Sequence, residues 1–268
     1  MLTNKRVNRF FQVDVFTEIP FSGNPTGVCI LEKPADGVYL TALASEFGLN
    51  QTAFLVKEER GYSIRFFTKY SEVVLCAHAS IAAAYILHQI GEALPKEPVV
   101  FRTAKHDILV QVEEDAYKVT LPEYQIKQID ITPDFVEITG LTPNELYQCS
   151  HDWYLGYYKE YEDLRRALPH FSKMKHSDYG HLVITTQGRK GEGDYVQRSF
   201  TPNHGVNEED VSGSAQCALV PFWKDKLHKN HFESHQMSKR GGILITRSID
   251  GKMVEIIGKA SLVMEGKF

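Results

Sequence analysis

The sequence lacks the features that mark several large classes of protein. It has no apolar run approaching the roughly 18–20 residues that cross a membrane, and its first residues lead into an alternating strand pattern, unlike the apolar core of a secretory leader. It has no concentrated Lys/Arg tract, and its formal net charge is −4, whereas a nucleic-acid partner requires a positive surface. We therefore expect a cytoplasmic protein with neither a membrane nor a nucleic acid as partner.

Metal and cofactor motifs are also missing. The four cysteines are widely spaced and form no C-x-x-C pair, and no second histidine lies at metal-ligand spacing from His78. The glycines between Gly188 and Gly193 fit no nucleotide-binding fingerprint and are typical of a hairpin turn. We expect no metal site and no cofactor, and the cysteine usage suits a reducing compartment.

What the sequence does contain is one pattern that occurs twice. Arg65-Phe66-Phe67-Thr68 precedes the small residues of 76–80, and Arg198-Ser199-Phe200-Thr201 precedes those of 211–215. Each copy predicts a strand, a polar loop and the opening of a helix. A helix N-terminus offers unpaired N–H groups and a partial positive charge, so it suits an anion. Two such openings predict a substrate that carries a carboxylate and is held between two similar lobes.

The apolar segments that follow these openings predict the fold. Residues 79–90 and 215–223 are apolar on nearly all sides of a helix, which indicates burial on nearly all sides. We expect an α+β fold of two similar lobes, each a curved, mostly antiparallel, barrel-like sheet wrapped around a central apolar helix, with the active site in the cleft between them. The predicted lobes are residues 1–121 and 144–268, joined by a crossing segment at 122–143, with the last strands able to close back onto the N-terminal lobe.

Other elements follow from periodicity and turn residues. Helical spacing is expected at 39–47, ended by Gly48, and at 164–171, while 195–200 predicts a strand and 21–27 a loop. Residues 40–56 match 168–184 in order, which supports an internal repeat. Pro221 lies inside the second apolar helix, where it removes one backbone hydrogen bond.

Several polar residues near these openings could carry chemistry, and each has a plainer explanation. Glu46, near the end of the first helix, is either a solvated carboxylate or one turned into a cleft, where burial would raise its pKa. His78 is either a structural hydrogen-bonding group or a catalyst. The acidic run 208–210 either favours the helix dipole or places one acid in the cleft. Ser80 and Ser214 are either helix caps or donors to a substrate carboxylate.

At this point the chain resembles the PhzF (phenazine biosynthesis) family along essentially its whole length. The matching segments are Val13-Asp14-Val15-Phe16, Phe21 to Val28, Ala44 to Phe54, Arg65 to Thr68, Glu72 to Ala79, Arg198 to Pro202, Val211 to Ala215, Arg240 to Leu244 and Gly258 to Ala260.

This resemblance implies the diaminopimelate-epimerase-like fold, a homodimer and cofactor-independent isomerase chemistry of a biosynthetic type. It implies that Glu46 moves a proton between carbons of a small, cyclic carboxylic acid, with His78 and Glu209 as further catalytic groups. The residues that it implies for binding the substrate are Asn24, Ala77, Ala79, Ser80, Gly213, Ser214 and Ala215.

Three positions depart from the family pattern. Ala77 stands where the family has glycine, so a methyl group would narrow the pocket. The family's acid falls on Glu209, one methylene longer than the usual aspartate, and the proline after it is lost. Gln216 replaces a histidine. These departures argue against assuming the phenazine precursor as substrate.

Two other functions stay open. Related epimerases place a cysteine on each lobe, but here Cys76 is matched by Ser212, whose hydroxyl is far too weak an acid to replace a thiol. An amino-acid-type epimerase or racemase is therefore one alternative. A non-catalytic small-molecule binder that keeps the fold is the other, because the substitutions at Ala77 and Gln216 affect the expected site.

Overall fold

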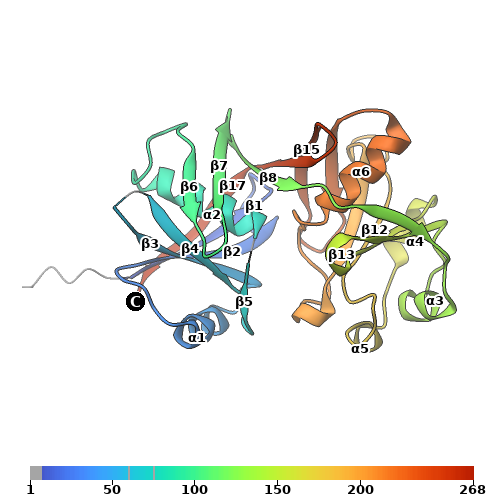
Figure 1. Ribbon diagram of the computed structural model, residues 1–268, viewed down its shortest axis with the longest axis horizontal. Helices are drawn as coiled ribbons and strands as arrows, with labels where there is room; N and C mark the ends of the chain where they lie inside the picture. The colour runs from blue at the N-terminus through green and yellow to red at the C-terminus, as the bar shows by residue number, and fades with distance from the viewer. Residues whose placement is uncertain (1–7, 60, 75) are drawn as a thin grey trace, which may run out of the picture. The chain divides into compact units, whose positions relative to one another are not determined.

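The computed structural model describes residues 8–59, 61–74 and 76–268. Leu75 and the first seven residues lie outside this part. The expectation that the chain has no secretory leader depends on those first residues. The chain forms two compact units: unit 1 runs to Val119 and includes Ile257–Phe268, and unit 2 is Thr120–Ile256. Both units mix sheet with a few helices in an α+β fold (Figure 1).

Unit 1 is a mixed sheet with two helices. Its strands pair in the order β17–β1–β2–β3–β4–β6–β7–β8, with β5 also on β4; the β2–β3 and β4–β6 pairs are parallel and the others antiparallel. The strands are β1 (Arg9–Val15), β2 (Asn24–Leu31), β3 (Gln51–Lys57), β4 (Tyr62–Phe67), β5 (Glu72–Val73), β6 (Val99–Arg102), β7 (Asp107–Glu113), β8 (Ala116–Pro122) and β17 (Ala260–Lys267), and the helices are α1 (Gly37–Phe47) and α2 (Ala77–Gln89).

Helix α2 is buried along almost its whole length. It packs against β1, β2, β3, β7 and β17, and Ala79, Ile81 and Ala82 are fully buried, as expected of a helix without a polar face. It begins at Ala77, two residues before the expected start, because the Cys76 side chain caps it by accepting a hydrogen bond from the Ala79 N–H at 3.4 Å. Helix α1 ends at Gly48, whose φ of 70° confirms the expected glycine stop.

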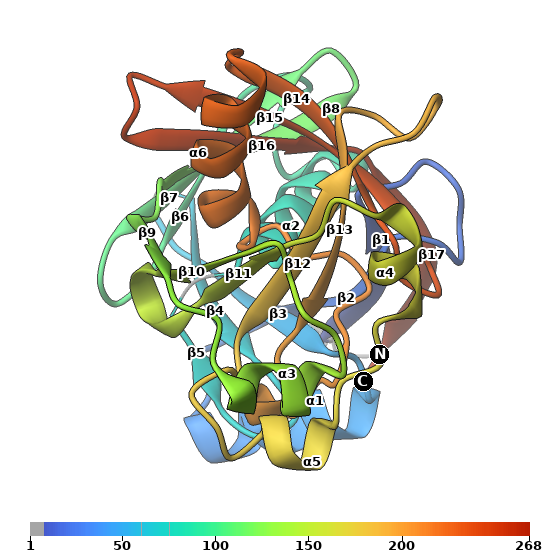
Figure 2. The ribbon, with the colours of Figure 1, turned by 90° about the vertical axis from the view of Figure 1, so that its right-hand side faces the viewer.

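Unit 2 repeats the pairing order of unit 1. Its strands run β9–β10–β11–β12–β13–β14–β15, with β11–β12 and β13–β14 parallel and the others antiparallel. Helix α6 packs against β15 and β9 (Figure 2). The elements are β9 (Ile126–Ile129), β10 (Glu145–Cys149), β11 (Tyr154–Tyr157), β12 (Leu182–Gln187), β13 (Tyr195–Phe200), β14 (His231–Gln236), β15 (Gly242–Ile249), β16 (Met253–Gly258), α3 (Pro133–Thr139), α4 (Tyr161–Arg166), α5 (Phe171–Met174) and α6 (Gln216–Leu227), with 3-10 turns at Ser150–Asp152 and Pro202–His204.

Several elements differ from those expected. The single helix expected at 164–171 is two short ones, because Pro169 lacks an N–H and disfavours helical backbone at the residue before it. Strand β2 begins at Asn24, inside the segment expected to be a loop. The segment 122–143 carries β9 and α3 and belongs to unit 2. Helix α6 continues to Leu227, beyond the expected end at Trp223.

Helix α6 tolerates Pro221 because a neighbouring segment replaces the lost hydrogen bond. Pro221 has no N–H to donate to the Cys217 carbonyl one turn earlier. The Tyr124 N–H donates to that carbonyl instead, at 2.8 Å. Helix α6 therefore continues through the proline without leaving a buried acceptor unpaired.

No helix in the described ranges is both long enough and apolar enough to span a membrane.

Candidate active site

The first polar cluster lies at the start of α2 in unit 1. The Sγ atom of Cys76 is 3.3 Å from Nε2 of His78 and donates a short hydrogen bond to Oε1 of Gln51, the first residue of β3. His78 is buried, and burial lowers its pKa to about 4. Its imidazole is therefore neutral at pH 7 and can accept a proton or a hydrogen bond there.

Gln51 is the residue of this cluster that the sequence analysis missed. It lies in the segment that resembles the family, but Glu46 was selected from that segment because it matches the family's catalytic glutamate. The signal that could have found Gln51 is its place as a polar residue at the first position of an apolar strand. Its contact with Cys76 depends on tertiary structure that a single sequence does not display.

Glu46 is not part of the Cys76 cluster. Helix α1 buries Leu40 and Ala44 against Cys29, Phe54 and Phe67, and Glu46 is exposed. Within the described ranges its carboxylate makes no hydrogen bond or ion pair. In unit 1, Glu46 is thus a solvated helix carboxylate.

The other predicted residues of unit 1 are close to the start of α2 or to the strands around it. Ala77, Ala79 and Ser80 form the first turn and are buried. The Ser80 hydroxyl donates to the Cys76 carbonyl at 2.8 Å, so it is already used within the helix. Asn24 is fully buried at the first position of β2.

The second cluster lies at the start of α6 in unit 2 and has the same local geometry. The Ser212 hydroxyl accepts from the Ala215 N–H at 3.4 Å, as Cys76 does from Ala79. It also lies 3.4 Å from the Ser214 hydroxyl. The Gln236 side chain accepts from the Ser212 N–H at 3.4 Å and donates to the Glu209 carbonyl at 3.3 Å. Gly213, Ser214 and Ala215 therefore form a turn that is held by these hydrogen bonds and leads into α6.

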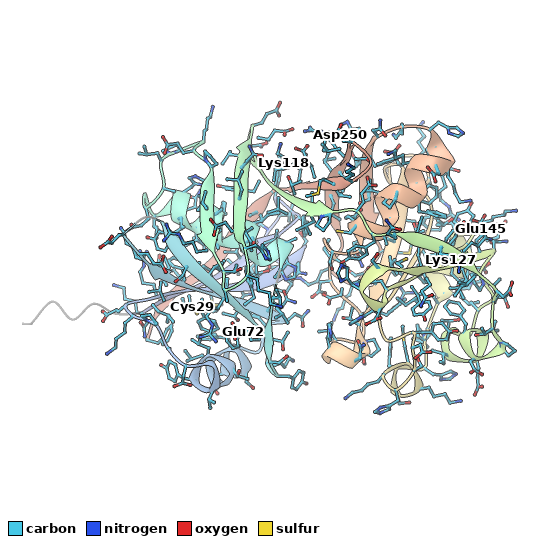
Figure 3. All side chains as sticks on the ribbon, in the orientation of Figure 1. Cys29, Glu72, Lys118, Lys127, Glu145 and Asp250 are labelled. Atoms are coloured by element: carbon cyan, nitrogen blue, oxygen red, sulfur yellow. The ribbon has the colours of Figure 1, made fainter. Side chains whose placement is uncertain are left out.

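Matching arginines support both openings. Arg65 donates to Glu72 (labelled in Figure 3) at 2.8 and 2.7 Å and to the Ala35 carbonyl at 2.9 Å. Arg198 donates to Glu208 at 2.7 and 2.9 Å and to the Ala167 carbonyl at 2.6 Å. Two-pronged Arg–carboxylate pairs are strong and directional. The Glu208 carboxylate is therefore used to fix its own loop to Arg198.

Glu209 is the acid of this run whose environment suits proton transfer. It is partly buried, and its Oε1 accepts from the Thr201 hydroxyl at 2.9 Å. Burial raises the pKa of Glu209 to about 7; the Thr201 hydrogen bond opposes this shift, and the nearby charge of Asp210 adds to it. A carboxyl with that pKa is present in both protonation states at neutral pH.

The raised pKa predicts a pH-dependent stability. The unfolded chain loses the Glu209 proton near the ordinary carboxyl pKa of 4.5, whereas in the folded chain the pKa is raised to about 7. Between these values the folded state binds more protons, so its contribution to stability is full below pH 4.5 and is lost as the pH rises through 7. We expect the melting temperature of wild type to fall more steeply than that of Glu209→Gln over this range, and parallel curves would contradict the shifted pKa.

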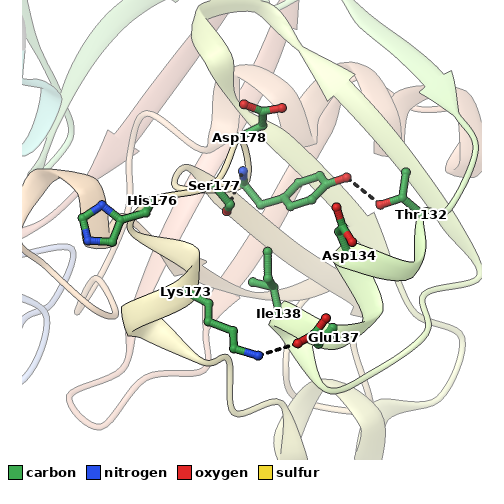
Figure 4. Close-up of a pocket in the computed structure, with 9 residues that line it drawn as sticks. Thr132, Asp134, Glu137, Ile138, Lys173, His176, Ser177 and Asp178 are labelled. Carbon is green, nitrogen blue, oxygen red and sulfur yellow. Dashed lines mark hydrogen bonds and ion pairs between the residues drawn. The ribbon is translucent and has the colours of Figure 1, made fainter.

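A separate hollow in unit 2 contains none of the predicted site residues. It has a volume of about 640 Å³ and lies beside α3 and α5 (Figure 4). An ion pair between Lys173 and Glu137 crosses it, and Thr132 and Tyr179 share a hydrogen bond of 2.8 Å at its wall. Because it contains none of the residues expected at the site and its one lysine is paired with Glu137, it is not the candidate site.

Metal ligands do not gather in either cluster. Over the described part of the chain, no group of three or more His, Cys, Asp or Glu side chains could hold a metal ion. The chemistry available at the two helix starts is that of carboxylates, an imidazole, a thiol and backbone N–H groups.

Comparisons with known proteins agree with the described geometry. The model of the phenazine biosynthesis-like protein family matches residues 13–266. An uncharacterized isomerase of Halalkalibacterium halodurans is 34% identical over 258 residues, which cover 96% of this chain and 97% of that protein. The crystal structure of a PhzF-family protein from Enterococcus faecalis superposes with a TM-score of 0.90 at 31% identity, covering 98% of this chain and 99% of the other. At 10% identity, a probable proline racemase from Agrobacterium radiobacter shares the fold, with a TM-score of 0.66 over 97% of this chain and 92% of that one.

Proposed function

Because the chain belongs to the phenazine biosynthesis-like (PhzF) family, we propose that it is an isomerase that moves a proton between carbons of a small, cyclic carboxylic acid. Relatives that carry the name isomerase at 34% identity support this reaction class. The reaction would proceed by acid–base catalysis without a cofactor, in a homodimeric cytoplasmic enzyme. The substrate carboxylate would accept hydrogen bonds from the N–H groups at the helix starts, where no intrahelical acceptor is available.

The observation that carries this proposal is the state of Glu209. An acid–base catalyst works best when its pKa is near the working pH, because it must both take up and release the proton. Glu209 meets this condition through burial, and Ser212 to Ala215 lie just after it in the chain. We assign it the role of proton donor and acceptor in unit 2.

Glu46 is proposed as the proton shuttle of unit 1. The support is the resemblance of residues 44–54 to the family's catalytic segment. Since Glu46 is exposed in unit 1, the bound substrate would have to supply the burial that makes a carboxylate an effective base. His78, neutral at pH 7, would orient the substrate by a hydrogen bond.

A panel assay tests the reaction class. The enzyme is incubated with small cyclic carboxylic acids that carry a double bond beside an acidic C–H, and products are followed by proton NMR. We expect one of them to be converted to a double-bond isomer of the same mass. Inversion at a saturated carbon, with no double-bond shift in any compound, would contradict the proposal.

A second candidate, a thiol-based epimerase, is favoured by one observation. Cys76 caps α2 and lies 3.3 Å from His78, and a helix N-terminus favours the reactive thiolate. Against it, Ser212 occupies the equivalent position in unit 2.

The variant Cys76→Ser separates the two candidates. Serine keeps the helix cap but cannot act as a thiol base, so a carboxylate-based isomerase should keep its kcat within about tenfold. A thiol-based enzyme should lose about 10²–10⁴-fold, the usual contribution of a general base. The comparison requires kcat for both proteins on the substrate found in the panel, with Cys29→Ser, at a buried position of β2, as the matched control.

A further inference from the structure

The sheet of unit 2 presents an unusual polar surface to its interior. Tyr195, Gln197 and Ser199 alternate along β13 and so point to one face, the face on which Tyr195 meets α6. Side chains of β14, β15 and α6 extend this face, and all six residues are fully buried. We call them the inner polar face: Tyr195, Gln197, Ser199, Ser234, Thr246 and Gln216.

Several polar atoms on this face have no partner within the protein. The Tyr195 hydroxyl donates to Oε1 of Gln216 at 2.7 Å. The atoms that have no hydrogen-bond partner and do not interact with Tyr195 are Oε1 and Nε2 of Gln197, Oγ of Ser199 and Nε2 of Gln216.

These atoms are neighbours and not scattered through the core. Ser234 is the register partner of Tyr195 on the adjacent strand. Burial raises the pKa of Tyr195, and hydrogen bonding from the Thr246 and Ser234 hydroxyls opposes that shift, so both hydroxyls lie at the Tyr195 hydroxyl. At the other end, Gln197 is the register partner of Gln236, whose side chain contacts the Ser212 N–H and the Glu209 carbonyl.

Unit 1 shows that the fold itself does not require polar residues here. The shared pairing order places Ile64 and Phe66 of β4 where unit 2 has Gln197 and Ser199, counting from Arg65 and Arg198. It likewise places Phe101 and Val110 where unit 2 has Ser234 and Thr246. All four unit 1 residues are buried and apolar. At these four positions the polar character is therefore particular to unit 2.

We propose that the inner polar face is a binding site for ordered water molecules, held between β13, β14, β15 and α6. Leaving the four unpartnered polar atoms dry would cost free energy amounting to a large part of the stability of a domain. Water is the smallest group that both donates and accepts, and buried waters usually serve such atoms. Because these atoms are closed off from solvent, the waters are part of the folded unit and do not depend on the proposed reaction.

A crystal structure of the full wild-type chain tests the proposal directly. At a resolution that shows ordered solvent, we expect water density within hydrogen-bond distance of the Gln197 amide and the Ser199 hydroxyl, in the absence of any substrate. Side chains that have turned to pair with one another, with no water between them, would overturn the proposal.

Thermal unfolding of isosteric variants gives an independent test. If water binds Ser199, then Ser199→Ala removes a hydrogen bond and lowers the melting temperature. If the face is dry, the same change removes an unpaired hydroxyl and raises it. The control is Thr185→Val, because Thr185 is equally buried and already bonds the Val196 carbonyl and the Trp223 indole. A raised melting temperature for Ser199→Ala beside a lowered one for Thr185→Val counts against bound water, and Gln197→Leu repeats the test should Ser199→Ala fail to fold.

Discussion

Glu209→Gln is expected to lower kcat by about 10²–10⁴-fold, the range over which a positioned general acid or base contributes. The amide keeps the size of the side chain and can still accept from Thr201, whose hydroxyl lies 2.9 Å from Oε1. It cannot take up or release a proton at neutral pH. The loss should therefore appear in kcat much more than in KM.

The matched control for this variant is Glu208→Gln. Glu208 forms a two-pronged ion pair with Arg198, so losing its charge should lower the melting temperature while leaving most of the rate. A Glu209→Gln enzyme with nearly wild-type kcat, or a Glu208→Gln enzyme that is folded but equally inactive, would count against Glu209 as the proton-transfer group. The pH–rate profile adds a check, because the limb near pH 7 should disappear in Glu209→Gln.

Glu46→Gln is expected to abolish proton transfer at the carbon that loses its proton, a drop of at least about 10²-fold. Since Glu46 is exposed on α1 and its side chain makes no hydrogen bond or ion pair within the described ranges, the change should leave the melting temperature within about 1 °C, as expected for a surface substitution. The measurement is kcat together with thermal unfolding, and Ser45→Ala, at the exposed position beside it, is the control.

An unchanged rate in Glu46→Gln would remove Glu46 from the mechanism without touching Glu209. Gln51 would then be the next position to vary, because it contacts Cys76 at the start of α2. Gln51→Leu keeps the bulk but removes the hydrogen bond. A rate loss in that variant, with Glu46→Gln fully active, would place the catalytically important residues of unit 1 in the Cys76 cluster at the start of α2.

The sequence was sufficient to predict the elements whose signals are local. The unbroken apolar run of α2, the stop at Gly48 and the strand expected at 195–200 all correspond to observed elements. The repeated arginines also had a detectable spacing, and Arg65 and Arg198 make equivalent contacts in their own units. These features depend on periodicity, caps and turn residues, which act over a few positions.

Features that depend on contacts distant in the sequence were missed. Gln51 meets Cys76 only through tertiary structure. The inner polar face is assembled from three strands and a helix, and none of its residues is unusual in its own segment. Short strands such as β10 and β11 carry too few residues for a period to be visible, and the break at Pro169 was hidden by the helical spacing around it.

Exchange of solvent deuterium into the substrate tests the central claim most directly. Wild type, Glu209→Gln, Glu46→Gln and Cys76→Ser are incubated in D₂O with the acid identified in the panel, and deuterium at the reacting carbons is measured by NMR. The account predicts that exchange is lost in both glutamate variants and persists in Cys76→Ser. Exchange that survives in both glutamate variants and disappears in Cys76→Ser would contradict carboxylate catalysis and establish a thiol-based mechanism instead.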